Sequence, residues 1–278
     1  MNAHSLLLSC AVLLIACSSD PNGLTGNVND GVDDVDSSAS ALTGPGISWM
    51  VYSEADRVTN LAACQGRVYK LTTDRRVLSA DAYRGDGYPT WSLRRTTDGS
   101  ATQITCGYGR IGSASFGSYL FYKTPAGTIS YEAVSSPTSL IWDRSGLAGD
   151  ARELKAFSTS DLWALNNSLW GYLGRVANLG PEILWSQRGY LWAAKRTAAT
   201  TDRDGNRLVI AINQDNTFWL SRDAGVTFSP MAASVDNALV GAYAVEIEAM
   251  RGADDRIYVY ALVNGPYLPY VYRGVFTP

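Results

Sequence analysis

The stretch that decides the fold is Asn216–Pro230, which has the sequence N-T-F-W-L-S-R-D-A-G-V-T-F-S-P. In the segment from Thr217 to Arg222, the side chains at odd positions (Thr, Trp, Ser) alternate with those at even positions (Phe, Leu, Arg). This period of two is typical of a half-buried β-strand. Asp223 and Gly225 then favour a tight turn, because aspartate accepts backbone hydrogen bonds ahead of it and glycine tolerates a positive φ. We therefore predict a hairpin whose second strand is Val226–Phe228.

Units of similar pattern recur through the rest of the chain at spacings of 40 to 50 residues. The first four units each offer four short strands separated by Gly, Asp, Asn or Pro, and no stretch keeps a helical period over three turns. The units span Val58–Arg95, Gln103–Arg144, Leu154–Gln187, Leu191–Ser229 and Val245–Phe276. Repeats of this length, each a four-stranded sheet, are the signature of a β-propeller.

The last unit lacks an outer strand, and Ile47–Val51 can supply it from the other end of the chain. This segment carries Trp49, which matches the aromatic residues of the other outer strands. They follow one another at steps of 51, 43 and 43 residues, at Trp91, Trp142, Trp185 and Phe228. We therefore predict an all-β fold, a propeller of five four-stranded blades over residues 47–278 that the N-terminal strand closes. Six blades or a β-sandwich are the alternatives, since short alternating strands allow both.

Two groups of known proteins share features with this pattern. Ser221–Phe228, S-R-D-A-G-V-T-F, resembles the Asp-box, which joins the two outer strands of a blade in sialidases and other propellers, away from the ligand face. Asp161–Asn167 and Gly66–Leu71 resemble the blades of tachylectin-like and tectonin-like propellers. The second resemblance implies a five-bladed sugar-binding lectin without catalytic activity. The first implies a glycoside hydrolase of sialidase type, although the R-I-P motif of those enzymes is absent.

The composition narrows the functions that this chain can have. A net charge of −3 and a pI of about 5.2 offer no basic patch, so we exclude nucleic acid as a partner. The only histidine is His4, which precedes the repeated units. This excludes histidine-dependent triads and histidine-ligated metals, and we predict neither a metal nor a cofactor. Sixteen tyrosines and eight tryptophans suit sheet surfaces and sugar-binding surfaces alike.

The N-terminal residues predict export and a lipid anchor. Residues 1–16 contain an apolar run that is too short to span a bilayer and suits a signal peptide. The run ends in L-I-A-C, which resembles the bacterial lipobox and implies that Cys17 is lipidated. Residues 17–46 are rich in Ser, Asp, Gly and Asn and show no periodicity, so we expect a disordered tether. We expect the protein in the bacterial cell envelope, held at the outer membrane by its lipid anchor alone.

The turns between the second and third strands of each blade should share one face of the propeller with the connections between blades. Carboxylate and amide side chains beside an aromatic platform are the groups that bind sugar hydroxyls. On this face we select as candidate ligand-binding residues Asp74, Arg75, Asn166, Asn167, Gln214, Asp215, Asn264 and Tyr267. The same residue types suit tight turns, which is the alternative explanation for their presence.

The leading hypothesis for function is a surface-tethered, non-enzymatic binding module for a glycan or surface polysaccharide. A sialidase-type hydrolase and a protein-binding scaffold are the alternatives. We also consider a disulfide, because Cys64 and Cys106 occupy nearly matching positions of the first two units and an exported protein meets an oxidising compartment. The bond requires Cα atoms within about 7 Å of each other, and two buried thiols are the alternative.

Overall fold

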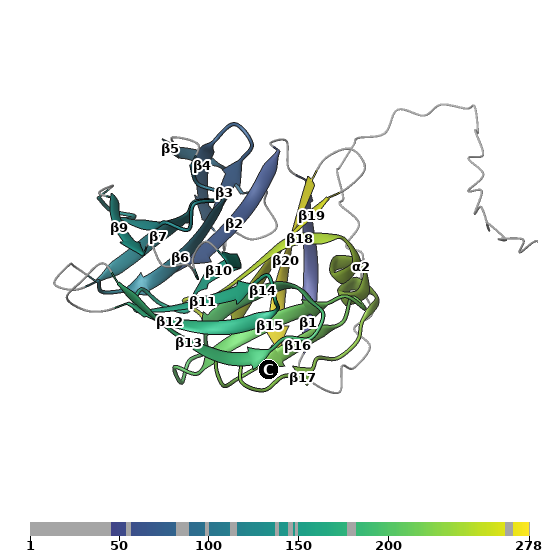
Figure 1. Cartoon of the computed structure of the whole chain (residues 1–278). Coiled ribbons are helices and arrows are strands. Elements are labelled where there is room, and N and C mark those ends of the chain that lie inside the picture. The colour runs from purple at the N-terminus through teal and green to yellow at the C-terminus, as the bar shows by residue number, and fades with distance from the viewer. Residues whose placement is uncertain are drawn as a thin grey trace, which may run out of the picture. The chain divides into compact units, whose positions relative to one another are not determined.

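The computed structural model describes residues 46–53, 57–81, 89–97, 100–111, 116–136, 139–143, 147, 150–176, 182–264 and 269–277. Within these ranges the chain forms five four-stranded antiparallel sheets, each of which is one blade of a β-propeller (Figure 1). The prediction of five blades is confirmed, and six blades and a β-sandwich are excluded. The predicted signal peptide, the lipidation site Cys17 and residues 17–45 of the predicted tether lie outside the described residues.

Blades 1 to 4 follow the order of the chain, and the first strand of each is the innermost. Blade 1 comprises β2 (Val58–Cys64), β3 (Arg67–Thr72), β4 (Arg76–Asp81) and β5 (Ser92–Thr96). Blade 2 comprises β6 (Gln103–Gly109), β7 (Gly117–Lys123), β8 (Ile129–Ala133) and β9 (Ser139–Asp143). Blade 3 comprises β10 (Ala151–Ala156), β11 (Asp161–Asn166), β12 (Trp170–Val176) and β13 (Ile183–Tyr190). Blade 4 comprises β14 (Ala194–Thr201), β15 (Arg207–Asn213), β16 (Phe218–Ser221) and β17 (Ser229–Pro230).

Blade 5 joins the two ends of the ring. Its strands, from inside to outside, are β18 (Ala244–Arg251), β19 (Ile257–Asn264), β20 (Pro269–Thr277) and β1 (Gly46–Ser53). β1 runs antiparallel to β20 in an unbroken register, from Gly46 opposite Thr277 to Ser53 opposite Tyr270. The predicted closure by the N-terminal strand is therefore confirmed.

The hydrophobic core of the described residues consists of five layers, one between each pair of adjacent blades. Middle strands contribute to two layers at once, because successive side chains of a strand point to opposite faces of the sheet. In β15, Leu208 and Ile210 pack toward blade 5, whereas Val209 and Ala211 pack toward blade 3. A strand that is buried on both faces needs apolar residues at successive positions. This explains the continuous apolar run of β15.

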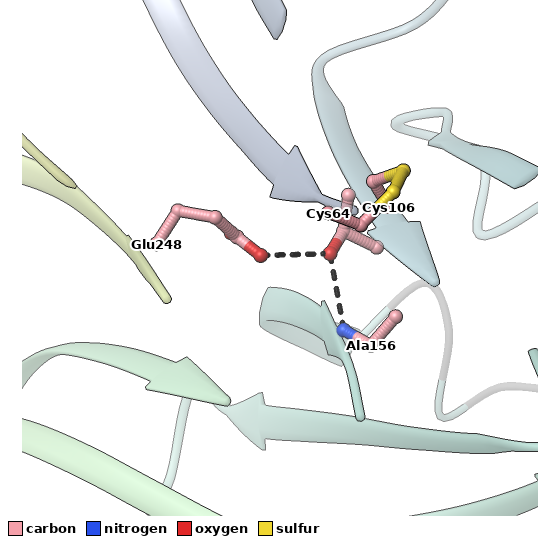
Figure 2. The surroundings of a disulfide bond; sticks show 5 residues. Cys64, Cys106, Ala156 and Glu248 are labelled. Carbon is pink, nitrogen blue, oxygen red and sulfur yellow. Dashed lines mark hydrogen bonds between the residues drawn. A yellow bond between two sulfur atoms is a disulfide. The ribbon is translucent and has the colours of Figure 1, made fainter. Parts of the chain in front are cut away.

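The inner strands β2, β6, β10, β14 and β18 lie beside one another in a closed ring. They belong to different sheets, so side chains rather than a backbone ladder connect them. Three matched bonds cross from one blade to the next: Asn60 Oδ1 accepts the Ile104 N–H at 2.7 Å, Gln103 Oε1 accepts the Leu154 N–H at 3.1 Å, and Glu153 Oε2 accepts the Thr197 N–H at 2.6 Å. A disulfide also joins blades 1 and 2, with the Cα atoms of Cys64 and Cys106 5.5 Å apart (Figure 2).

The predicted strand Val226–Phe228 is wrong, because β17 begins only after this segment. The carboxylate of Asp223 accepts the backbone N–H groups of Val226 at 3.0 Å and Thr227 at 2.9 Å, so these donors do not enter a strand ladder. Gly225 has a φ of 81°, and an added Cβ would lie 2.4 Å from a ring atom of blade 3. The turn therefore requires glycine at this position.

The sequence pattern does not predict α2 (Val235–Tyr243), the helix between blades 4 and 5. The hydroxyl of Ser234 accepts the N–H of Asn237 and so begins the helix. Asn237 in turn accepts a 2.8 Å hydrogen bond from the indole of Trp49 in β1. The helix is too short for an apolar period to stand out in the sequence, and its contacts with the closing strand stabilise it instead.

Candidate functional site

The turns between the second and third strands share one backbone geometry in blades 1, 3 and 4. In each turn the N–H of one residue donates to the carbonyl three positions earlier, and these donors are Arg75, Leu169 and Asn216. The three residues have φ values of 69°, 65° and 69°. Asp74 of blade 1 and Asp215 of blade 4 directly precede such a residue, so they occupy matched positions.

A pocket of about 280 Å³ opens between blades 3 and 4, on the face of the propeller that carries these turns. We call it the rim pocket, and three segments line it: the β11–β12 turn, the end of β13 with its connection to β14, and the β15–β16 turn. Its lining residues are Leu169, Tyr190, Trp192, Ala193, Asn213, Gln214 and Asp215. Main-chain bonds hold the segments together, from Leu191 to Leu169 at 2.9 Å and from Gln214 to Ala193 at 2.8 Å.

Aromatic side chains form one wall of the rim pocket. Trp192 is 77% exposed and Tyr190 is 50% exposed. The ring of Tyr190 lies 5.1 Å from that of Trp170, and this packing holds it in place. An exposed aromatic ring beside polar side chains is the arrangement that ligand sites use to bind a partly apolar molecule.

The acidic group of the rim pocket is Asp215. Its Oδ1 accepts the hydroxyl of Thr217 at 2.6 Å and the N–H of the same residue at 3.1 Å. The Thr217 hydroxyl and then its N–H hold the pKa of Asp215 below the usual value, so this carboxylate is ionised at neutral pH. The hydroxyl of Thr217 also accepts the indole N–H of Trp219 at 2.9 Å. The carboxylate is thus fixed in orientation while it faces solvent.

The backbone of the rim pocket is strained at two positions. Leu169 and Ala193 both have a φ of 65°, a region that non-glycine side chains seldom adopt. Such conformations cost free energy, and they cluster at ligand sites where the surrounding structure maintains them. Both residues line the rim pocket, but Arg75 has a φ of 69° in the matched turn of blade 1, which does not line it, so a positive φ alone does not identify the site.

The structure distributes the predicted ligand residues over separate turns and brings only two of them into the rim pocket, Gln214 and Asp215. Asn166 belongs to the β11–β12 turn, where its Oδ1 accepts the Trp170 N–H at 2.9 Å, and its neighbour Asn167 is exposed. The amide of Asn166 therefore supports the turn itself.

The other predicted ligand residues lie in blades 1 and 5. The carboxylate of Asp74 binds the hydroxyl of Thr72 and accepts the Nε–H of Arg76 at 2.6 Å, and Arg75 beside it is exposed. Asn264 is exposed at the end of β19, whereas Tyr267 lies outside the described residues. The residues of these two blades do not line the rim pocket.

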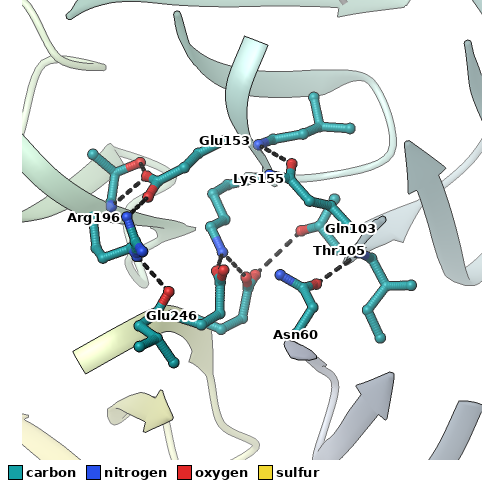
Figure 3. Close-up of polar contacts among 12 residues, drawn as sticks. Asn60, Gln103, Thr105, Glu153, Lys155, Arg196 and Glu246 are labelled. Carbon is teal, nitrogen blue, oxygen red and sulfur yellow. Dashed lines mark hydrogen bonds and ion pairs between the residues drawn. The ribbon is translucent and has the colours of Figure 1, made fainter. Parts of the chain in front are cut away.

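A second group of polar side chains fills the channel inside the ring of inner strands (Figure 3). We call it the channel cluster, and its members are Thr105, Glu153, Lys155, Arg196, Glu246 and Glu248. The ammonium of Lys155 donates to the carboxylates of Glu246 and Glu248, to the latter at 3.0 Å. Glu153 accepts the hydroxyl of Thr197 at 2.6 Å in addition to its backbone bond. The carboxylate side chains are at most 8% exposed. Lys155 pairs with two of them, whereas Glu153 Oε1 has no hydrogen-bond partner among the described residues and lies 3.8 Å from Arg196 Nη1.

Burial shifts the proton equilibria of the channel cluster. It raises the pKa of Glu248 to about 8, against the opposing effect of Lys155. Burial, and then the charge of Glu246, also raises the pKa of Glu153. For Lys155, burial favours the neutral form, but the carboxylates of Glu246 and Glu248 outweigh it and raise its pKa. Raised carboxyl pKa values are a feature of general acids, but a general acid must also reach a substrate.

Two sets of residues are missed by the sequence pattern. The pattern predicts a strand from Leu191, whereas β14 begins at Ala194 and Trp192 lies in the turn before it. The connections between blades are expected on the ligand face, so an aromatic residue in such a connection is the signal that identifies Trp192. For the channel cluster, the signal is a charged residue at every second position of an inner strand, as at Glu153 and Lys155.

The described residues contain no group of three or more His, Cys, Asp or Glu side chains that could hold a metal ion. None of the helices within the described ranges has the length and apolar character needed to cross a membrane.

No protein-family model and no curated protein matches this chain. Among solved structures, it is similar to Trypanosoma rangeli sialidase, with 12% identity and a TM-score of 0.45, over 80% of this chain and 45% of the sialidase chain. The chain thus spans less than half of that enzyme. It is also similar to YCF48 bound to D1 peptide (12% identity, TM-score 0.42, 81% of this chain and 96% of that chain). The WD40 β-propeller domain of Doa1 is another such structure (8% identity, TM-score 0.43, 84% and 97%).

Proposed function

We propose that this chain is a non-enzymatic carbohydrate-binding module that holds a sugar unit in the rim pocket. The observation that carries the proposal is the exposed indole of Trp192 in one pocket with the carboxylate of Asp215 and the amide of Gln214. An aromatic ring packs against the C–H face of a sugar, while carboxylate and amide groups bind its hydroxyls. A volume of about 280 Å³ lies at the small end of ligand pockets and suits one sugar unit of a longer glycan.

The charge of the rim pocket favours a neutral glycan or surface polysaccharide as the partner. Asp215 is the only charged residue among the described residues that line it. An ionised carboxylate accepts hydrogen bonds from neutral sugar hydroxyls, and it repels carboxylate-bearing sugars such as sialic acid.

A sialidase-type hydrolase is the second candidate, and the carboxylates of the channel cluster are the feature that favours it. Glycosidases work with a pair of carboxyl groups on either side of the scissile bond, or with a tyrosine in the sialidase case. The side chains of Glu153, Glu246 and Glu248 are 3%, 8% and 0% exposed, so a sugar cannot pass between them without opening the ring. The rim pocket is open but has one carboxylate. Binding without hydrolysis is therefore the better-supported proposal.

We also propose how the module is held in place. Cys17 in L-I-A-C would carry a lipid that anchors the protein in the bacterial cell envelope, with the outer membrane as the expected location. Ser221–Phe228 would act as a structural clasp of the Asp-box type, and the hydrogen bonds that the Thr227 N–H donates to the Asp223 carboxylate support this role. Intact mass of the membrane-extracted protein should then begin at Cys17 plus acyl groups, and a mature form that begins at Met1 would contradict the anchor.

A glycan array with the full chain tests the proposed function. We expect binding to neutral glycans, and we expect Trp192→Ala to weaken it at least about fivefold, since a stacked aromatic contributes more than about 1 kcal/mol. Asp215→Asn should also weaken binding. Asp74→Asn is the matched control, because Asp74 has the same place in its turn but lies outside the rim pocket.

A fluorogenic sialoside assay on the same preparations separates the two candidates. Hydrolysis of the sialoside would support the enzyme and contradict the proposal. A blank array together with a protein captured reproducibly by the wild type would favour a protein-binding scaffold. Equal loss of binding in Asp74→Asn and Asp215→Asn would show that the rim pocket is not the site.

A further inference from the structure

A second pocket lies at the opposite end of the same inner strands. β14 follows Ala193 of the rim pocket and ends at this second pocket with Thr200 and Thr201, roughly 23 Å farther along the strand. The pocket has a volume of about 280 Å³, and the ends of the inner strands of all five blades contribute to its lining. We call it the mouth pocket, because it is the end of the central channel.

Small side chains at matched positions make room for the mouth pocket. Four inner strands carry a backbone irregularity directly before matched residues, Asn60, Glu153, Arg196 and Glu246. Three positions farther along, every one of these strands has alanine, at Ala63, Ala156, Ala199 and Ala249. Three of these alanines line the pocket, and Cys106 of β6 lies among them. The cavity thus results from a repeated choice of small residues in successive blades.

The mouth pocket is closed at its floor by the channel cluster. The fully buried hydroxyl of Thr105 accepts the N–H of Ala156, a lining residue, at 3.0 Å and donates to Glu248 at 3.2 Å. Figure 2 shows this path of hydrogen bonds between Glu248 and Ala156, together with the Cys64–Cys106 disulfide. A ligand can therefore enter this cavity but cannot pass through the ring.

The lining of the mouth pocket combines apolar side chains, neutral polar ones and one cation, and the neutral polar residues are Gln65, Tyr108, Ser158, Thr200 and Thr201. Phe157 and Met250 are buried, and Phe116 at the edge is 63% exposed. Arg251 is the only charged residue among the described lining residues. Its Nη1 donates to the carbonyl of Asp202 at 3.1 Å, the only hydrogen bond of this side chain within the described ranges. The Nε and Nη2 donors of the guanidinium are thus left for an acceptor.

We propose that the mouth pocket binds a small carboxylic acid with an aromatic or apolar body. The carboxylate pairs with Arg251, whose planar guanidinium matches the two oxygens of a carboxylate. The body packs between Phe116 and the sulfur of Met250, a contact that aromatic rings favour. The site and its ligand are separate from the glycan site of the rim pocket, so either proposal can fail alone.

The test measures binding of phenylacetate to the full chain by titration calorimetry and saturation-transfer NMR. Phenylacetamide is the control ligand, since it has the same shape without the charge. We expect phenylacetate to bind at least about tenfold more tightly than the amide, because hydrogen bonds between charged groups are the stronger ones. Arg251→Leu should reduce the affinity for phenylacetate by at least about tenfold, and Arg251→Lys should reduce it less.

Two further variants keep the test decisive if Arg251→Leu unfolds the chain by losing the bond to Asp202. Phe116→Ala removes a ring that is 63% exposed and whose centroid lies 5.4 Å from that of Tyr108, so it should change the melting temperature little while it weakens phenylacetate binding several-fold. Trp192→Ala should leave phenylacetate binding unchanged. The proposal is overturned if phenylacetate does not bind at millimolar concentration, if the amide binds equally well, or if Phe116→Ala has no effect. Loss of binding in Trp192→Ala would assign the ligand to the rim pocket and overturn it too.

Discussion

The channel cluster and the rim pocket both draw residues from blades 3 and 4, and both contain carboxylates, yet their surroundings differ. In the channel cluster, Glu246 and Glu248 share the ammonium of Lys155, and none of these side chains is more than 8% exposed. In the rim pocket, Asp215 faces solvent beside Trp192, which is 77% exposed. The polar groups of the first region bind one another, and those of the second can bind a ligand.

The comparison shows that a cluster of charged side chains does not by itself identify a ligand-binding site. Buried charges that satisfy one another fix the arrangement of the blades, and removing one of them leaves its partner unpaired. An exposed aromatic ring contributes little to the fold, and its contribution appears when a ligand covers it. Substitutions in the two regions should therefore have different effects. Those in the channel cluster should change the stability of the fold, and those in the rim pocket should change ligand binding.

The largest expected effect comes from opening the ring, on which both regions depend. Deleting residues 1–53 removes β1 and exposes the edge of β20, so we expect loss of cooperative unfolding, or aggregation. Deleting residues 1–44 leaves β1 in place and should keep the melting temperature of the full chain. Circular dichroism during heating compares the two deletions. Equal melting of both would show that closure by β1 does not maintain the propeller.

Removing the cation of the channel cluster should have the next largest effect. Lys155→Met leaves Glu246 and Glu248 buried without their shared partner, and we expect a loss of about 3–5 kcal/mol in the free energy of unfolding. Trp192→Ala is the comparison at the rim and should stay within about 0.5 kcal/mol of the wild type. Urea unfolding measures both. If the two variants lose similar stability, the contrast between channel and rim is wrong.

A smaller effect should appear in the pH dependence of stability. The pKa of Glu248 is about 8 in the folded chain and 4.5 by the reference value for an unfolded one, so folding takes up a proton between these values. Stability that depends on this proton is present at low pH and is lost as the pH rises from about 5 to 8. Urea unfolding at pH 5.5 and 8.5 should show this fall, and Glu248→Gln should reduce it. An unchanged slope in the variant would show that Glu248 does not carry the proton.

The sequence predicts the ring because each blade repeats the same physical requirement. Middle strands buried on both faces must be apolar throughout, and the turns between them need residues such as Asp, Asn and Gly, so blade number and closure by Ile47–Val51 can be predicted without coordinates. Hydrogen bonds between a side chain and the backbone close to it are harder to predict from the sequence. The carboxylate of Asp223 takes the backbone donors of Val226 and Thr227, and the predicted strand is lost for that reason.

The candidate site was predictable in part. Gln214 and Asp215 can be predicted from the turn to which they belong, but the matched turn of Asp74 has the same backbone and does not line the rim pocket. The difference comes from Trp192 in the neighbouring connection, which sequence pattern assigns to a strand. A site between blades depends on what the adjacent blade places opposite a turn. That information is spread over segments that are far apart in the chain.

A crystal structure of the full chain with the glycan that it binds most tightly on the array tests the central claim most directly. We predict a sugar ring stacked on the indole of Trp192, with at least one hydroxyl hydrogen-bonded to the carboxylate of Asp215 and the channel cluster unchanged. A sugar bound in the mouth pocket, at the turn of Asp74, or between the carboxylates of Glu246 and Glu248 would contradict it.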